Sequence, residues 1–352
     1  MTFFLLLALA GSTLSGQTTH RPKVLLIYDM EGISGATRSE YVRANKPEYA
    51  EGRRILLNDV NAAVRGLSNG GAKSIWVQDG HASGNGAEPD LLVDQLDPRA
   101  RFDFRKYPFS AYTTGLDASI DAIICIGMHA RARTNGFLAH TFNRDINYRV
   151  NDVDFTETHI VAMSAARFGI PVIMVSGDDV LGTQLQADFP DLEYAVVKTA
   201  ESVGSAKALP PGEAQKRIEA RAEAAMKKFL AGRYRAYFLP PPYRYEVQFR
   251  NAEPMAMALR FPGVEKASDT SVRLSNTNYM DGYLAASTLF TAANDRLDVL
   301  IRLLQTTPEG RETLKKWDDS FWDRFTNPET APAWTKSPGP NATPPKAYYG
   351  AQ

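Results

Sequence analysis

Short apolar runs alternate with amphipathic stretches along the first half of the chain, and this alternation limits the fold more than any other feature. The runs are continuous and bounded by Gly, Asp or Pro, as is typical of strands buried on both faces of a sheet. The expected strands are KVLLIY (23–28), SIWVQ (74–78), AIICIG (122–127) and PVIMVS (171–176), and the expected helices span about 49–67 and 157–168, with Gly70-Gly71 closing the first. The pattern predicts an α/β fold with a largely parallel sheet flanked by helices.

A second region with a different pattern begins near residue 209. A helical pattern spans 213–230, an alternating stretch at 244–250 is typical of a half-exposed strand, and a helical pattern returns at 279–304. We therefore expect an α/β domain at 20–208, a smaller C-terminal α+β domain at 209–318 and a Pro-rich tail at 319–352, of which the stretch from about Thr326 lies extended on the surface.

The N-terminus has the pattern of a secretory signal peptide. An apolar run at 3–10 is followed by small and polar residues, although no Lys or Arg precedes it. The run is too short to span a bilayer in the mature protein. We expect residues 1–19 to be a cleaved signal and the protein to be periplasmic or secreted; a buried first strand is the alternative.

The charge balance excludes two classes of partner. The 352 residues include 40 basic and 40 acidic side chains, so no electrostatic argument favours nucleic acid or an anionic membrane surface.

The single cysteine, Cys125, rules out an internal disulfide and a zinc site made of several thiolates. Any metal must therefore be held by carboxylates and by some of the five histidines.

Metal-binding residue types follow three of the expected strands. Asp29 and Glu31 follow the first, His81 follows the second and His129 follows the third. Because parallel strands place these ends along one edge of the sheet, we expect the side chains to converge despite their separation in sequence. Asp29 and Glu31 are two residues apart, so they point the same way if the chain stays extended. The fourth strand ends at the same edge in Asp178-Asp179.

These residue types indicate a zinc centre. Carboxylates and imidazoles together suit Zn²⁺, with Mn²⁺ or Co²⁺ as substitutes, and are numerous enough for two bridged ions that activate water, as in aminopeptidases and phosphatases. Taken singly, each residue has a simpler explanation as a turn former, a helix cap or a satisfied core histidine. Spacing alone leaves His140 and His159 open as catalytic or packed residues, and His20 lies beside the signal.

Glycines cluster in two of these loops, the one with Asp29 and Glu31 and the one with His81. Gly32 and Gly35 follow the first strand, and Gly80, Gly84 and Gly86 follow the second. Neither group has the Walker lysine or the dinucleotide pattern, so no nucleotide site is expected. We interpret both as turns that let the chain approach a metal closely.

Five motifs together resemble those of the bacterial metallo-D-aminopeptidase family in order and spacing. They are YDMEGISG (28–35), QDGHAS (78–83), IGMHARA (126–132), GFLAHT (136–141) and PVIMVSGDD (171–179). The similarity extends from about Lys23 to Asn294 and includes YEVQFRNAEPMAMALRFPGVE (245–265). The resemblance implies a metallo-aminopeptidase that hydrolyses the N-terminal residue of short peptides, with D-residues such as D-Ala as substrates.

Carried over position by position, the resemblance implies the roles of individual residues. Two zinc ions per chain would be held by Asp29, Glu31, His81, His129 and Glu157, with Asp29 as the bridge. Glu157 enters through the resemblance alone, because its neighbour His159 is otherwise an equal candidate. The family's spacing back from PVIMVSGDD selects Glu157. His140 matches the family's further active-site histidine, with an implied role in proton transfer, in stabilising the tetrahedral intermediate or as a nucleophile.

The chain departs from the family pattern at several places. Ile27 stands where the family has Ser two residues before the first Asp, so the surroundings of Asp29 are expected to differ. The signal and the segment beyond about residue 295 lie outside the pattern. The family forms large rings that enclose an access channel, which implies a homo-oligomeric ring here. Two alternatives stay open: a binuclear hydrolase of phosphoesters or cyclic amides, and an exported solute-binding or metal-binding protein without catalysis.

Overall fold

The structure is a computed structural model, and the part of the chain that it describes has gaps. The described residues are 22–81, 88–104, 112–113, 115–142, 144–210, 212–250, 252–292 and 304–326. The expected signal peptide, Gly84, Gly86 and residues 327–352 of the expected tail lie outside these ranges.

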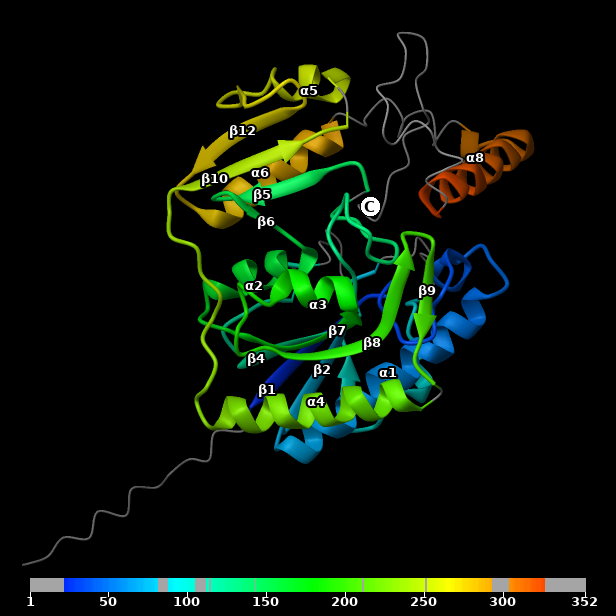
Figure 1. Cartoon of the computed structure of the whole chain (residues 1–352), viewed down its shortest axis with the longest axis vertical. Coiled ribbons are helices and arrows are strands. Elements are labelled where there is room, and N and C mark those ends of the chain that lie inside the picture. Colours follow the sequence, from blue (N-terminus) through cyan, green and yellow to red (C-terminus); the bar gives the residue numbers. More distant parts are fainter. Residues whose placement is uncertain are drawn as a thin grey trace, which may run out of the picture.

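The first of two sheets is seven-stranded and mostly parallel, and helices flank it (Figure 1). Its strand order is β3-β2-β1-β4-β7-β8-β9, and only β9 runs antiparallel to its neighbour. The strands are β1 (Lys23–Tyr28), β2 (Ser74–Asp79), β3 (Ala100–Phe102), β4 (Ala122–Met128), β7 (Val172–Asp178), β8 (Glu193–Ser202) and β9 (Ser205–Ala208). The four strands predicted from the sequence are confirmed, as is the α/β class.

Helices cover both faces of this sheet, which explains its continuous apolar strands. On one face lie α1 (Tyr49–Gly70) and α4 (Glu213–Leu230), and on the other lie α2 (Glu157–Ala166) and α3 (Asp179–Leu185) (Figure 1). Alternate residues of β1 serve the two cores: Val24 and Leu26 pack with α1 and α4, and Leu25 and Ile27 pack with α2. Gly71 adopts φ 108° at the end of α1, as the predicted glycine C-cap requires.

A second, antiparallel sheet packs over the α2 side of the first. Its order is β11-β12-β10-β5-β6, and α6 packs against its strands (Figure 1). Its elements are β5 (Asn147–Val150), β6 (Val153–Asp154), β10 (Tyr243–Gln248), β11 (Glu265–Lys266), β12 (Ser271–Asn276), α5 (Ala252–Ala258) and α6 (Tyr279–Ala292). Side chains of β10 alternate between buried and more exposed positions, as its sequence pattern predicts.

Each of the two sheet layers contains elements from both sides of residue 208. β5 and β6 come from the N-terminal side and pair with β10, whereas α4 comes from the C-terminal side and packs against α1. The domain limits proposed from the sequence stay a prediction.

A C-terminal helix, α8 (Pro308–Thr326), includes the first residues of the expected tail. Residues 319–326, which open the expected tail, are therefore helical, since no proline interrupts the chain between Pro308 and residue 328. Two short 3₁₀ helices complete the described elements: η1 (Ser39–Val42) and η2 (Val93–Gln95).

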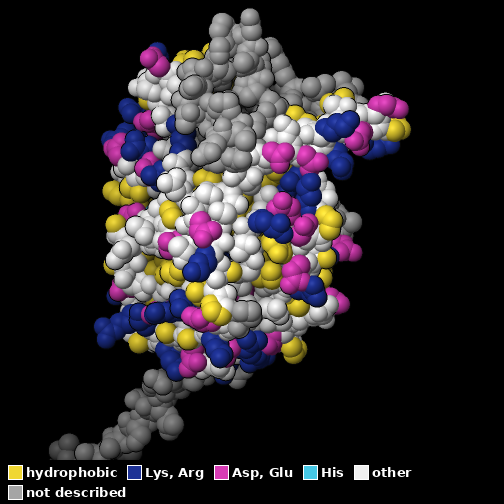
Figure 2. All heavy atoms as spheres, turned by 45° about the vertical axis from the view of Figure 1, so that its right-hand side comes forward, with side chains coloured by type: hydrophobic (Ala, Val, Ile, Leu, Met, Phe, Trp, Pro, Cys, Tyr) yellow, Lys and Arg dark blue, Asp and Glu magenta, His cyan; other side chains and the backbone are white. Residues whose placement is uncertain are grey.

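The surface carries both charge signs, intermingled. Figure 2 shows basic and acidic side chains interspersed over one face of the molecule, in line with the net charge of zero. Among the helices in the described ranges, none is both long enough and apolar enough to cross a membrane.

Candidate metal centre

Three adjacent strands carry four of the predicted metal residues to one edge of the sheet. β1 lies between β2 and β4, and Tyr28 at its end pairs with Asp79 of β2 and Ile126 of β4. The chain therefore leaves all three strands at about the same level. Asp29 and Glu31 lie after β1, His81 after β2 and His129 after β4.

Two glycines let the first and third of these loops touch along their backbones. The amide of Asp29 donates to Ile126 O (2.8 Å) and that of Gly32 donates to Gly127 O (2.7 Å). A Cβ on Gly32 would lie 1.9 Å from Met128 O, and Gly127 has φ +78°. Gly32 was expected to make room for a metal; the space that it leaves is filled by the neighbouring backbone instead. This contact brings Asp29 next to His129.

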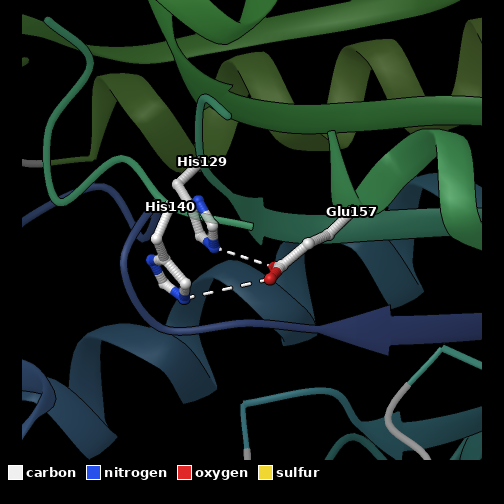
Figure 3. A group of neighbouring side chains, drawn as sticks. All are labelled: His129, His140 and Glu157. Atoms are coloured by element: carbon white, nitrogen blue, oxygen red, sulfur yellow. Dashed lines mark ion pairs between the residues drawn. The ribbon is translucent and has the colours of Figure 1, made fainter. Parts of the chain in front are cut away.

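The predicted site residues form two buried groups that meet. Each group offers three ligand atoms within 4.8 Å of one another. One group is Asp29, Glu31 and His81, and the other is His129, His140 and Glu157 (Figure 3). The groups are linked where His129 Nε2 lies 3.4 Å from Asp29 Oδ2. All six residues named from the sequence therefore lie together, with His140 inside the second group.

Glu157 and His140 reach the centre from elements other than strand ends. Glu157 is the first residue of α2, and its Oε2 lies 2.9 Å from His129 Nε2. His140 lies in the loop between β4 and β5, with Nε2 3.9 Å from Glu157 Oε1. The imidazoles of His129 and His140 are stacked with their centroids 3.9 Å apart.

All three histidines present the same nitrogen to the centre. The Nδ1 atoms of His81, His129 and His140 lie 3.0, 3.0 and 2.8 Å from Asp90 Oδ2, Ala130 O and Leu138 O respectively. Because a carbonyl or carboxylate oxygen only accepts, Nδ1 carries the proton in each ring. The lone pair is then on Nε2, which is the usual arrangement of metal-binding histidines and their supporting oxygens.

Unsatisfied buried atoms indicate that the site fits a cation. Asp29 Oδ2, both carboxylate oxygens of Glu31 and His129 Nε2 have no hydrogen-bond partner among the described residues. Burying a carboxylate oxygen without a donor is costly, and a divalent ion would satisfy these atoms at once. Oxygen and nitrogen ligands without thiolate are the set that suits Zn²⁺ in hydrolytic sites.

The first carboxylate pair is electrostatically asymmetric. Burial, followed by repulsion from Glu31, raises the pKa of Asp29 well above its usual value. Burial also opposes ionisation of Glu31, but the interactions led by His81 lower the pKa of Glu31 well below its usual value. Burial lowers the pKa of His140, and His129 adds to this effect.

Comparison with known proteins identifies the family. The sequence profile of the peptidase M55 family, described as D-aminopeptidase, matches residues 23–288. The chain belongs to this D-aminopeptidase family. It is 29% identical over 270 residues to a D-aminopeptidase of Bacillus subtilis (strain 168), covering 75% of this chain and 94% of that protein.

A solved structure of the family has the same fold. It is described as the Zn-dependent D-aminopeptidase DppA from Bacillus subtilis, a self-compartmentalizing protease, and superposes with a TM-score of 0.71 at 27% identity. The similarity covers 77% of this chain and 97% of that one. Our chain is thus a peptidase of the D-aminopeptidase family with two candidate metal-binding groups, and the family match includes all six site residues.

Several residues that support the centre were missed by the sequence analysis. Asp90 contacts His81 and accepts a hydrogen bond from the Tyr49 hydroxyl, and the Tyr112 hydroxyl donates to Glu157. Lys198 is fully buried and donates to Glu31 O (2.7 Å). A lysine inside the apolar run YAVVKTA was a signal for such a role, whereas Asp90 and Tyr112 have no local pattern.

Other candidates named from the sequence have structural partners outside the centre. His159 caps α2 with Thr156, and its Nε2 lies 3.1 Å from Asp188 Oδ2. Asp178 accepts from the amides of Phe137 and Leu181, so it holds the loop that precedes His140. His20 lies outside the described residues.

Proposed function

We propose that this protein is a binuclear-zinc aminopeptidase that removes the N-terminal residue from short peptides, with D-residues such as D-Ala as its substrates. One observation carries the proposal: two buried three-residue groups of carboxylates and imidazoles meet at the Asp29–His129 contact. The Zn-dependence and D-aminopeptidase activity named for the Bacillus subtilis protein support the choice of metal and substrate.

The two groups divide the ligands between two ions. Glu31 and His81 would hold one ion, His129 and Glu157 the other, and Asp29 would bridge them because its Oδ2 faces His129. Asp29, Glu31 and Glu157 would offset three of the four positive charges of two zinc ions in a buried site. When bound, such ions polarise a carbonyl and lower the pKa of a bound water molecule to about 7.

His140 is the residue proposed to move the proton. Its Nδ1 donates to Leu138 O, which fixes the ring and leaves the lone pair of Nε2 directed to the centre. The ring can therefore take a proton from the attacking water and return it to the leaving amine. Proton transfer of this kind contributes about 10²–10⁴-fold to the rate.

A substrate panel with metal analysis tests the proposal. We expect purified protein to hold two zinc ions per chain and to hydrolyse D-Ala p-nitroanilide faster than the L-enantiomer. A chelator should abolish the activity and added zinc should restore it. Hydrolysis of p-nitrophenyl phosphate alone would support the phosphoesterase alternative, and metal binding with no turnover would support the binding-protein alternative.

A His140→Ala variant tests the proton-transfer role. The rate should fall about 10²–10⁴-fold, because the variant lacks the group that carries the proton. Zinc content, measured by atomic absorption, should stay at two ions per chain. Full activity in this variant would contradict the role, and loss of one ion would make His140 a ligand instead.

Assembly and location complete the proposal. The description of the Bacillus subtilis structure as self-compartmentalizing supports a homo-oligomeric ring, which native mass spectrometry would detect as a single closed stoichiometry. The signal-like segment at 1–19 supports export, and the mature N-terminus of the exported protein should then lie near residue 20.

A further inference from the structure

Tyr112 contacts the candidate metal centre from a segment that contributes none of the predicted ligands. It lies between β3 and β4 and is 9% exposed. Its hydroxyl lies 2.6 Å from Glu157 Oε2. Because a carboxylate only accepts hydrogen bonds, the phenol is the donor, and a hydrogen bond to an ionised oxygen at this distance is a strong one.

Glu157 needs such a partner more than the other acidic residues do. It extends into the centre from the first position of α2, and the terminal torsion of a glutamate side chain has a broad energy minimum. Asp29, by contrast, has a short side chain that accepts from the Met30 amide (2.8 Å). The orientation of the Glu157 carboxylate therefore depends on what its two oxygens contact.

The contacts of Glu157 divide between these oxygens. Oε2 lies 2.6 Å from the Tyr112 hydroxyl and 2.9 Å from His129 Nε2. Oε1 accepts from the Phe142 amide at 3.2 Å and lies 3.9 Å from His140 Nε2. The backbone contact at Oε1 is the longer of the two hydrogen bonds, so the phenol is the tighter restraint on the plane of the carboxylate.

We propose that Tyr112 is a positioning residue that fixes the Glu157 carboxylate for binding the ion that Glu157 and His129 would hold. The inference rests on the proposed function, because it assumes that these two residues bind an ion. Outer hydrogen-bond partners of metal ligands commonly matter about 10–100-fold for affinity or activity. The effect of Tyr112 should fall mainly on one ion, because Tyr112 contacts Glu157, whereas His81 of the other group is contacted by Asp90.

The variant Tyr112→Phe removes the hydroxyl and keeps the ring that packs in the core. A matched control is Tyr245→Phe. Tyr245 lies in β10 of the second sheet and is fully buried, and its hydroxyl donates to Tyr279 O of α6 at 2.7 Å. Metal-free full-length protein would be titrated with zinc chloride by calorimetry, and kcat would be measured with saturating zinc. Circular dichroism of each metal-free variant would verify that it is folded.

We expect Tyr112→Phe to bind one ion as the wild type does and the other about 10–100-fold more weakly. Tyr245→Phe should bind both ions normally. Normal affinity for both ions in Tyr112→Phe would overturn the proposal. A wild-type protein that binds fewer than two ions would instead contradict the binuclear centre of the proposed function.

A double-mutant cycle separates positioning from a packing effect. If Tyr112 acts through Glu157, then Tyr112→Phe should weaken binding far less in a Glu157→Gln background than in the wild type. Independent, multiplying effects of the two substitutions would show that Tyr112 acts by another route and would also overturn the proposal.

Discussion

Two buried ionisable residues hold the loop that follows β1 through hydrogen bonds. Asp59 of α1 accepts from the amide and hydroxyl of Ser34, at 2.8 and 2.9 Å. Lys198 of β8 donates to the carbonyls of Glu31 and Ala36, at 2.7 and 2.6 Å. An acceptor and a donor thus fix the backbone on which the Glu31 carboxylate depends, although neither residue belongs to the candidate ligand groups.

Asp59 should make the stability of the protein depend on pH. Burial raises its pKa from 3.8 to about 6, so the folded state binds this proton more tightly than the unfolded state. The stability that this group contributes is present below pH 3.8 and is lost as the pH rises past about 6. Relative to Asp59→Asn, the metal-free wild type should lose about 2 to 3 kcal/mol of unfolding free energy between pH 4 and 7.

Urea unfolding of both proteins across this range measures the difference directly. Groups far from residue 59 titrate equally in the two proteins, so they cancel in the comparison. A difference that stays constant from pH 4 to 7 would mean that the pKa of Asp59 is the same in the folded and unfolded states.

At the scale of elements, the contact between the β1 and β4 loops determines where two of the candidate ligands lie. Gly32→Ala should disrupt it, because the new Cβ would lie 1.9 Å from the backbone oxygen of Met128. We expect a loss of about 1–3 kcal/mol in stability and a clear loss of bound zinc, measured by thermal unfolding and metal analysis.

Gly35→Ala is the matched control in the same loop. Its new Cβ would meet Ile55 Cδ1 at 2.8 Å, which is the end of a flexible side chain that can move. This variant should keep its zinc. Equal zinc content in Gly32→Ala and Gly35→Ala would show that the loop contact does not position Asp29 and His129.

The same loops explain how much of the site the sequence could predict. Asp29, Glu31, His81 and His129 follow parallel strands, and parallel pairing alone brings strand ends to one edge. Glu157 begins a helix after the antiparallel β5–β6 pair, so no periodicity places it there and only the family resemblance identified it. Tyr112 and Asp90 meet their partners through packing between distant segments, which single-sequence patterns do not encode. The antiparallel sheet was also missed in part, since β5 and β6 are too short to give a pattern.

At the scale of the whole molecule, α8 lies beyond the family match, which ends at residue 288. It is nevertheless anchored to the helices that cover the first sheet. Trp322 is 4% exposed and belongs to the core shared by α1 and α4. Its ring lies 4.8 Å from the Arg43 guanidinium, which also pairs with Asp318 at 2.6 Å. The helix therefore holds the segment that follows the Asp29 loop, and a helix outside the matched residues contributes a side chain to the core of the matched part.

Removing this anchor should detach α8 while the candidate metal centre stays intact. Trp322→Ala removes a large buried ring, for which the usual cost is about 3–5 kcal/mol, and it also leaves Arg43 without its stacking partner. Limited proteolysis should then cut within 304–326 much faster, with zinc content unchanged, because none of the six site residues lies on α8. Trp317→Ala, on the same helix but at a half-exposed position, should have a much smaller effect. Equal protease resistance of Trp322→Ala and the wild type would mean that the ion pairs of Arg43 and Lys46 with Asp318 and Asp319 are sufficient to hold the helix.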